Sequence, residues 1–169
     1  MAEAKSETAR KIFVLDTSAI MSLVQDVTTY RGTELPAFAG VLADNEIVIP
    51  RVVLDELNAL RRATGERSKV AMEAARQLEH YSTLGSLLEG VETEKGGLLR
   101  IAARPTNEKV IAWGLKANVA DHEILATTIE IEDQVKAEGK SGDFEDDEER
   151  DVPQDILITQ DRILRVLAR

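Results

Sequence analysis

The chain of 169 residues contains no cysteine, which excludes disulfide bonds, thiolate zinc sites and cysteine nucleophiles. Only 4% of the residues are aromatic, so Leu, Ile, Val and Ala must fill most of the core that the 43% apolar content allows. No apolar run approaches the ~20 residues of a membrane-spanning helix. Residues 1–10 are polar and lack the apolar stretch of a signal peptide, so we predict a flexible N-terminus and a cytoplasmic protein with no membrane partner.

Basic residues are outnumbered, and the formal net charge is −10. Residues 138–155 hold nine acids and two bases, so one segment carries seven of the ten excess negative charges. This segment contains glycine and lacks hydrophobic periodicity, and we predict a mobile acidic insertion at about 138–154. Because the rest of the chain is close to neutral, the acidic balance does not exclude a substrate that carries phosphate.

Short apolar runs alternate with longer helical patterns along residues 11–169. We predict a single α/β domain, a three-layer α/β/α sandwich around a mostly parallel sheet of four or five strands. The predicted strands are Lys11–Leu15, Glu46–Pro50, Leu98–Ala102 and Ile156–Thr159. The predicted helices are Ser18–Val24, Pro36–Leu42, 51–63, Ser68–Leu88, Asp121–Lys136 and Asp161–Leu167, with Asn107–Lys116 ambiguous.

Two acids fall on the apolar faces of predicted helices. Glu56 lies on the stripe formed by Val53, Leu57 and Leu60, and Asp121 lies on the face of Ile124, Leu125 and Thr128. A carboxylate that faces the core costs several kcal/mol unless it meets a cation or a hydrogen-bond donor. The solvated faces of the same helices are expected to carry Asp55 on the first, and Glu123, Glu130 and Gln134 on the second.

Two further acids, Asp16 and Asp161, follow or nearly follow predicted strands, where ligands bind in open α/β sheets. Asp16, Asp121 and Asp161 each have an ordinary alternative role as caps of the helices that begin beside them. Taken together with Glu56, however, the four acids are predicted to converge at one edge of the sheet.

Clustered carboxylates repel each other, and burial raises their pKa values, so a divalent cation would relieve both problems. Without cysteine, oxygen ligands favour Mg²⁺ or Mn²⁺ over zinc. The two histidines do not build a zinc site: His80 is expected on a helix surface and His122 in a structural or solvent-facing place.

These residues resemble the motifs of the PIN domain family over residues 11–169. Asp16-Thr17-Ser18 after an apolar strand is similar to the opening motif, and Glu56 is similar to the second acid of the family. Asp121 at the head of a helix resembles the third acid, and Thr159-Gln160-Asp161 resembles the motif of the last strand.

The closer resemblance is to PIN domains fused to PhoH-type ATPases, in which an arginine-bearing helix like that around Arg76 follows the second acid and the last strand leads to a Leu-Arg pair like Leu164-Arg165. Toxin nucleases of the VapC type share the acids but are usually shorter. This chain departs from both groups in its acidic insertion, which falls between the third and fourth acids and is therefore expected to flank the active site.

The resemblance implies a parallel sheet of the 3-2-1-4-5 type and metal-dependent hydrolysis of RNA. It implies that Asp16, Glu56, Asp121 and Asp161 are the catalytic residues and bind Mg²⁺ or Mn²⁺, directly or through water. Thr17, Ser18 and Thr159 are expected to hydrogen-bond these carboxylates. For Thr17 and Ser18 the alternative is an ordinary capping role at the first helix.

Exposed basic side chains near Glu56 are the candidates for contact with the phosphates of a nucleic-acid backbone. The alternative is a solvated helix end, where cations are also favoured. These candidates are Arg61, Arg62, Arg67, Lys69 and Arg76. Trp113 could stack a base, although a lone tryptophan beside Val110, Ile111 and Leu115 is more often part of a core.

Two rival enzyme classes fit poorly. A haloacid dehalogenase-type phosphatase needs a second aspartate where this chain has Ser18, and the acid–lysine pattern of a response-regulator receiver is not found. The serious alternative is a PIN fold that binds nucleic acid or serves as an assembly module in a larger RNA-processing machine. The predicted partners are single-stranded RNA, a second copy or larger homo-oligomer, and a fused or associated ATPase or an antitoxin.

Overall fold

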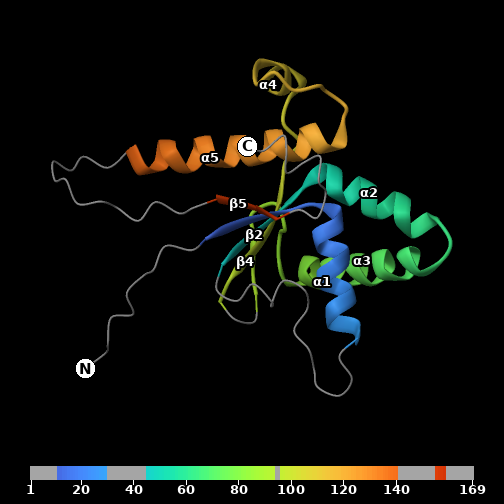
Figure 1. Cartoon of the computed structure of the whole chain (residues 1–169). Helices are drawn as coiled ribbons and strands as arrows, with labels where there is room; N and C mark the ends of the chain where they lie inside the picture. The colour runs from blue at the N-terminus through green and yellow to red at the C-terminus, as the bar shows by residue number, and fades with distance from the viewer. Residues whose placement is uncertain (1–10, 30–44, 94–95, 141–154, 159–169) are drawn as a thin grey trace, which may run out of the picture.

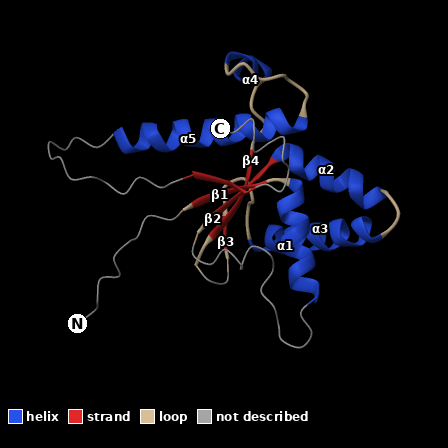
Figure 2. Cartoon of the chain, viewed as in Figure 1, coloured by secondary structure: helices blue, strands red, loops and turns tan. Residues whose placement is uncertain are grey.

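The structure is a computed structural model that describes residues 11–29, 45–93, 96–140 and 155–158 (Figure 1). The helices α1 (Thr17–Thr29), α2 (Arg51–Arg62) and α3 (Glu66–Leu84) lie on one side of a central sheet, and the long helix α5 (Ala120–Lys140) covers the other and also contacts α2 near its first turns. Figure 2 shows the three layers, with α4 (Asn107–Ala112) beside α5. The predicted α/β/α sandwich is therefore confirmed.

The five strands are arranged in the order β3-β4-β2-β1-β5. Four of them are parallel neighbours and lie within one residue of their predicted bounds, and their order by position in the chain is 3-2-1-4. The fifth strand differs from the prediction. It is a two-residue strand that pairs antiparallel with β4 at the opposite edge from β5. The strands are β1 (Ile12–Leu15), β2 (Glu46–Pro50), β3 (Val91–Glu92), β4 (Leu98–Ala102) and β5 (Asp155–Ile158).

The predicted helices are confirmed with shifted ends where the structure describes them. The break at Thr64-Gly65 separates α2 from α3, and Gly65 adopts a φ of 101°, which a residue with a side chain rarely adopts. The third helix stops at Leu84 rather than Leu88, since the chain turns away at Gly85. The ambiguous segment forms α4 over its first half only. The predicted helices Pro36–Leu42 and Asp161–Leu167, residues 1–10 and residues 141–154 of the insertion lie outside the described residues, whereas 138–140 end α5.

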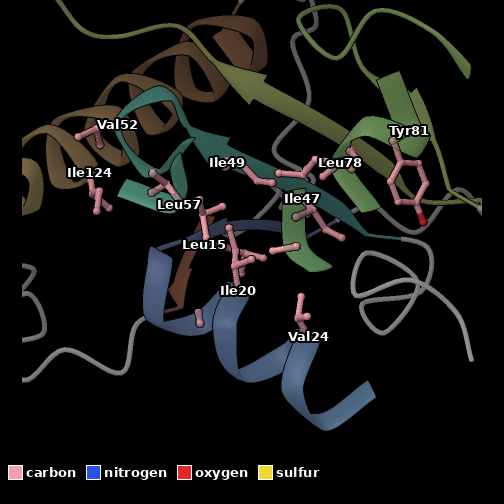
Figure 3. Packing of buried hydrophobic residues seen from close by; sticks show 14 of the residues in the cluster. Leu15, Ile20, Val24, Ile47, Ile49, Val52, Leu57, Leu78, Tyr81 and Ile124 are labelled. Atoms are coloured by element: carbon pink, nitrogen blue, oxygen red, sulfur yellow. The ribbon is translucent and has the colours of Figure 1, made fainter. Parts of the chain in front are cut away.

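Alternation along the strands gives the sheet two apolar faces. Leu15 points into the larger cluster with α1, α2 and α3, whereas Val14 points to the opposite face, where Ile131 of α5 covers it. In Figure 3, strand residues of the larger cluster meet side chains from α1 and α3. The labelled ones include Ile20, Val24, Ile47, Ile49, Leu78 and Tyr81.

Chain order reverses at β1, because β2 and β4 lie to one side of it and β5 lies to the other. In open α/β sheets such a point opens a crevice beyond the carboxyl ends of the strands. Asp16 immediately follows β1 at this position. None of the helices in the described parts of the chain is long and apolar enough to cross a membrane.

Candidate active site

A cavity of about 340 Å³ opens beyond the carboxyl end of β1. Its wall is formed by Asp16, directly after β1, and by residues from α1, α2, α5 and the start of α3. The lining residues are Asp16, Thr17, Ser18, Glu56, Ala59, Leu60, Arg67, Asp121 and Ile124. Three of the four predicted metal ligands, both hydroxyl residues of the first motif and one predicted phosphate contact thus surround a single cavity. The remaining predicted site residues, Asp161 and Thr159, lie outside the described residues.

Asp16 is buried, with 3% of its surface exposed, and its Oδ1 accepts a hydrogen bond from the backbone N–H of Ala19 at 2.6 Å. Its backbone oxygen accepts from the N–H of Ile20 at 3.1 Å. Asp16 therefore caps α1, which is the ordinary role that its sequence position suggested. The same residue also lines the cavity, so the capping contact and a place at the candidate site coexist.

Glu56 is partly buried and points from α2 into the cavity, as its position on the apolar stripe predicted. Burial raises the pKa of its carboxyl group above the ordinary value of 4.5, and the negative charges of Asp121 and Asp16 raise the pKa further. The hydroxyl of Thr17 donates a hydrogen bond to Glu56 Oε2, which acts in the opposite direction on this pKa. The three carboxylates are thus close enough to influence one another.

Asp121 is the second residue of α5 and lies within its first turn, rather than in front of it as a capping residue would. Negative charge is favoured at this end of a helix. The neighbouring His122 accepts a hydrogen bond at Nδ1 from the backbone N–H of Lys116 at 3.0 Å, so it fastens the segment that leads into α5. His80 is exposed, and its ring meets that of Tyr81 edge-on. His80 therefore lies on a helix surface and His122 makes a structural contact, as predicted for each.

The donor chemistry of this cavity suits a hard divalent cation, because carboxylate and hydroxyl oxygens are the ligands that Mg²⁺ and Mn²⁺ prefer. The raised pKa of Glu56 agrees with this, since a cation would favour the charged form. Over the described ranges, however, no three His, Cys, Asp or Glu side chains are gathered closely enough to enclose a metal ion. Glu56 is hydrogen-bonded to the Thr17 hydroxyl, and Asp16 is hydrogen-bonded to the α1 backbone.

The predicted phosphate contacts are spread over two helices. Arg67 lines the cavity, whereas Arg61 and Arg62 are exposed in the last turn of α2. Two others are ion-paired on α3: Lys69 with Glu66, and Arg76 with Glu73, through Nε at 2.8 Å and Nη2 at 2.6 Å. Arg67 is therefore the member of this group that the structure brings to the carboxylates.

A second hollow, of about 290 Å³, adjoins the first between α1 and the start of α3. The two share Ser18 and Arg67, so they form neighbouring parts of one depression. The wall of this second part combines polar and apolar side chains. Apart from the shared pair, the lining residues are Met21, Ser22, Gln25, Glu66 and Val70.

The prediction that Glu123 lies on a solvated face of α5 is wrong, because Glu123 is buried, with 5% of its surface exposed. Arg104 lies two residues after β4 and reaches over this face, where its Nε is 2.9 Å from Glu123 Oε2. Glu130, predicted exposed, is also partly covered and pairs with Lys109 of α4. Helical periodicity did not reveal these contacts, because the covering residues come from the segment between β4 and α5. Of the other residues predicted to face solvent, Asp55 and Gln134 are exposed.

Trp113 ends α4 and is partly buried. It is not among the side chains that form or line the two apolar clusters of the described residues, so the expected core role is met only in part. It also lies apart from the residues that line the cavity.

Comparison with known proteins gives three findings. The sequence profile described as "PIN domain" matches residues 13–169. Protein PhoH2 of Bacillus subtilis (strain 168) is 28% identical over 160 residues, covering 94% of this chain and 30% of that protein, so the chain spans less than a third of the relative's length. A similar solved structure is a domain of a functionally unknown protein from Methanocaldococcus jannaschii DSM 2661, with 20% identity, a TM-score of 0.48, and coverage of 94% of this chain and 84% of that one.

Proposed function

The chain belongs to the PIN domain family, whose members are generally nucleases that use divalent metal ions, and we propose from this premise that it is a Mg²⁺- or Mn²⁺-dependent ribonuclease. The proposed reaction is hydrolysis of a phosphodiester bond in single-stranded RNA. We assign the catalytic and metal-binding roles to Asp16, Glu56 and Asp121, together with Asp161 outside the described residues.

The observation that supports this function best is the meeting of three carboxylates in one cavity: one directly after β1, one on α2 and one on α5. Residues 16, 56 and 121 are far apart in sequence, and only the fold brings them together. The pKa of Glu56 is raised partly by the other two, so the group carries electrostatic repulsion that a bound cation would remove. Perturbed carboxylates in a cleft are typical of functional sites.

The residues divide the work according to their positions. The carboxylates would hold the cation, which would supply Lewis acidity and a more acidic water. The hydroxyl of Thr17 orients Glu56 through its hydrogen bond, so that the carboxylate keeps one direction toward the cavity. The cap at Asp16 fixes that carboxylate against the first turn of α1. Both hydrogen bonds restrict the side chains before a cation binds, so less conformational entropy is lost on binding.

Arg67 is proposed to bind a phosphate of the RNA, because its side chain borders both parts of the depression. A strand that placed one phosphate at the carboxylates would pass Arg67 and continue into the hollow between α1 and α3. There Met21 and Val70 offer apolar surface to a base, while Ser22 and Gln25 offer polar groups. Contacts to the phosphate backbone would make binding dependent on salt but not on sequence.

The test is cleavage of end-labelled single-stranded RNA and DNA of the same sequence, with Mg²⁺, Mn²⁺ or EDTA. The wild type is expected to cut RNA only when metal is present. Glu56→Gln should lower the rate at least about a hundredfold, since metal assistance is worth several kcal/mol. Glu79→Gln makes the same chemical change at an exposed position on α3 and should cut at the wild-type rate. Equal rates for both variants would refute the assignment of Glu56.

The alternative function is a PIN fold that binds RNA or serves as an assembly module without turnover. It would be supported if the protein bound the labelled RNA and left it intact at every metal concentration. Association with a second copy, with a fused or separate ATPase, or with an antitoxin remains a prediction from the sequence.

A further inference from the structure

One guanidinium group joins the two helices that carry Glu56 and Asp121. Arg104 Nη2 donates a hydrogen bond to Asp55 Oδ2 at 2.7 Å, and Asp55 is the neighbour of Glu56 on α2. Arg104 Nε lies 2.9 Å from Glu123 Oε2, and Glu123 is two residues after Asp121 on α5. Both carboxylates that Arg104 contacts therefore lie within two residues of a candidate metal ligand.

The ion pair between Arg104 and Glu123 of α5 is strengthened by burial of the carboxylate. The Glu123 side chain is only 7% exposed, whereas those of Arg104 and Asp55 are 47% and 52% exposed. A buried carboxylate is strongly destabilising unless a cation compensates it. Glu123 Oε2 receives no well-directed hydrogen bond within the described residues, so the ion pair with Arg104 is its identified compensation. Glu123 therefore anchors Arg104, and Arg104 in turn draws the exposed Asp55 toward α5.

The planar guanidinium can bind two carboxylates at once in a fixed geometry, which a lysine ammonium on a flexible stem cannot do equally well. We propose that Arg104 is a positioning residue: it bridges Asp55 and Glu123 and so sets the separation of α2 and α5 at which Glu56 and Asp121 can share one divalent cation. This inference rests on the proposed metal site but assigns a role to a residue outside the cavity wall. Groups that orient metal ligands from behind typically change metal affinity about 10- to 100-fold when they are removed.

The sign of the effect separates positioning from simple electrostatics. Arg104 is itself a cation close to the carboxylates, so its charge disfavours binding of a second cation. If charge were its only influence, Arg104→Gln would bind Mn²⁺ more tightly than the wild type, and Arg104→Lys would bind it equally. Positioning predicts weaker binding for both variants.

The experiment is titration of the metal-free proteins with Mn²⁺ by isothermal calorimetry, at a temperature where circular dichroism shows each variant folded. We expect about a tenfold or larger loss of Mn²⁺ affinity in Arg104→Gln and a smaller loss in Arg104→Lys, which keeps a positive charge opposite Glu123. The matched control is Lys109→Gln. It removes a cation of similar exposure, 53%, that pairs with Glu130 further along α5, and its Mn²⁺ affinity should stay within about twofold of the wild type or become slightly tighter.

The outcomes distinguish this inference from the proposed function. Wild-type binding with unchanged or tighter binding by both Arg104 variants would overturn the positioning role and leave the metal site intact. Absence of Mn²⁺ binding by the wild type would overturn both. If Arg104→Gln does not fold, Arg104→Lys decides alone: wild-type affinity in that variant overturns the inference, and a clear loss supports it.

Discussion

Asp16 offers a test in which two substitutions at one position separate its two contributions. Its Oδ1 accepts the Ala19 N–H at the start of α1, and its charge raises the pKa of Glu56. Asn can accept the same capping hydrogen bond but carries no charge. Ala carries no charge and cannot accept the hydrogen bond. Without metal, Asp16→Asn should therefore be as stable as the wild type or more stable, because repulsion is relieved. Asp16→Ala should be less stable than Asp16→Asn by about 1 kcal/mol, the usual value of a cap.

For a domain of this size, 1 kcal/mol corresponds to a difference of about 2–4 °C in the melting temperature. Thermal unfolding followed by circular dichroism in EDTA measures it directly for the three proteins. Mn²⁺ should then raise the melting temperature of the wild type and have much less effect on either variant. Equal stability of the Asn and Ala variants would refute the capping argument. A marked loss of stability in the Asn variant would refute the claim that repulsion at this site matters.

Three further perturbations test the neighbouring groups. Mn²⁺ at 100 times its Kd should stabilise the wild type by about 2.7 kcal/mol, or roughly 5–10 °C, and EDTA should reverse the shift; no shift at millimolar Mn²⁺ contradicts native-state binding. Thr17→Val removes the hydrogen bond that lowers the Glu56 pKa, so a carboxyl titration followed by NMR should show that pKa rising further, and an unchanged pKa would show that the contact is unimportant. Because folding raises the Glu56 pKa above 4.5, the metal-free wild type should lose stability relative to Glu56→Gln as the pH rises from 4.5 through the folded-state pKa; a difference in melting temperature that stays constant with pH would count against this.

The sequence was sufficient to predict the elements that position the site. Four apolar runs became the four parallel strands, and the stripe of Val53, Leu57 and Leu60 correctly oriented Glu56 toward the interior. These predictions succeed because periodicity within one helix or strand records which side is buried. The antiparallel strand β3 was missed because two residues carry no periodic signal.

Contacts between distant segments could not be predicted in the same way. Glu123 was expected in solvent because its position in the α5 pattern says nothing of Arg104, which arrives from the end of β4. Likewise, the run of basic residues after Glu56 gave no reason to single out Arg67. The place of Arg67 on the cavity wall depends on how α3 packs beside α1. An arginine two residues after a strand was the available signal for Arg104, but it identifies neither partner.

The most direct test of the central claim is Mn²⁺ binding itself, measured by calorimetry on metal-free wild type and on Glu56→Gln at neutral pH. If the three carboxylates share a cation, the wild type should bind Mn²⁺ saturably. The affinity of the variant should be at least about tenfold lower, because it loses one charged ligand while keeping the same shape. Equal affinity in the two proteins, or no binding by either, would contradict a shared metal site in this cavity.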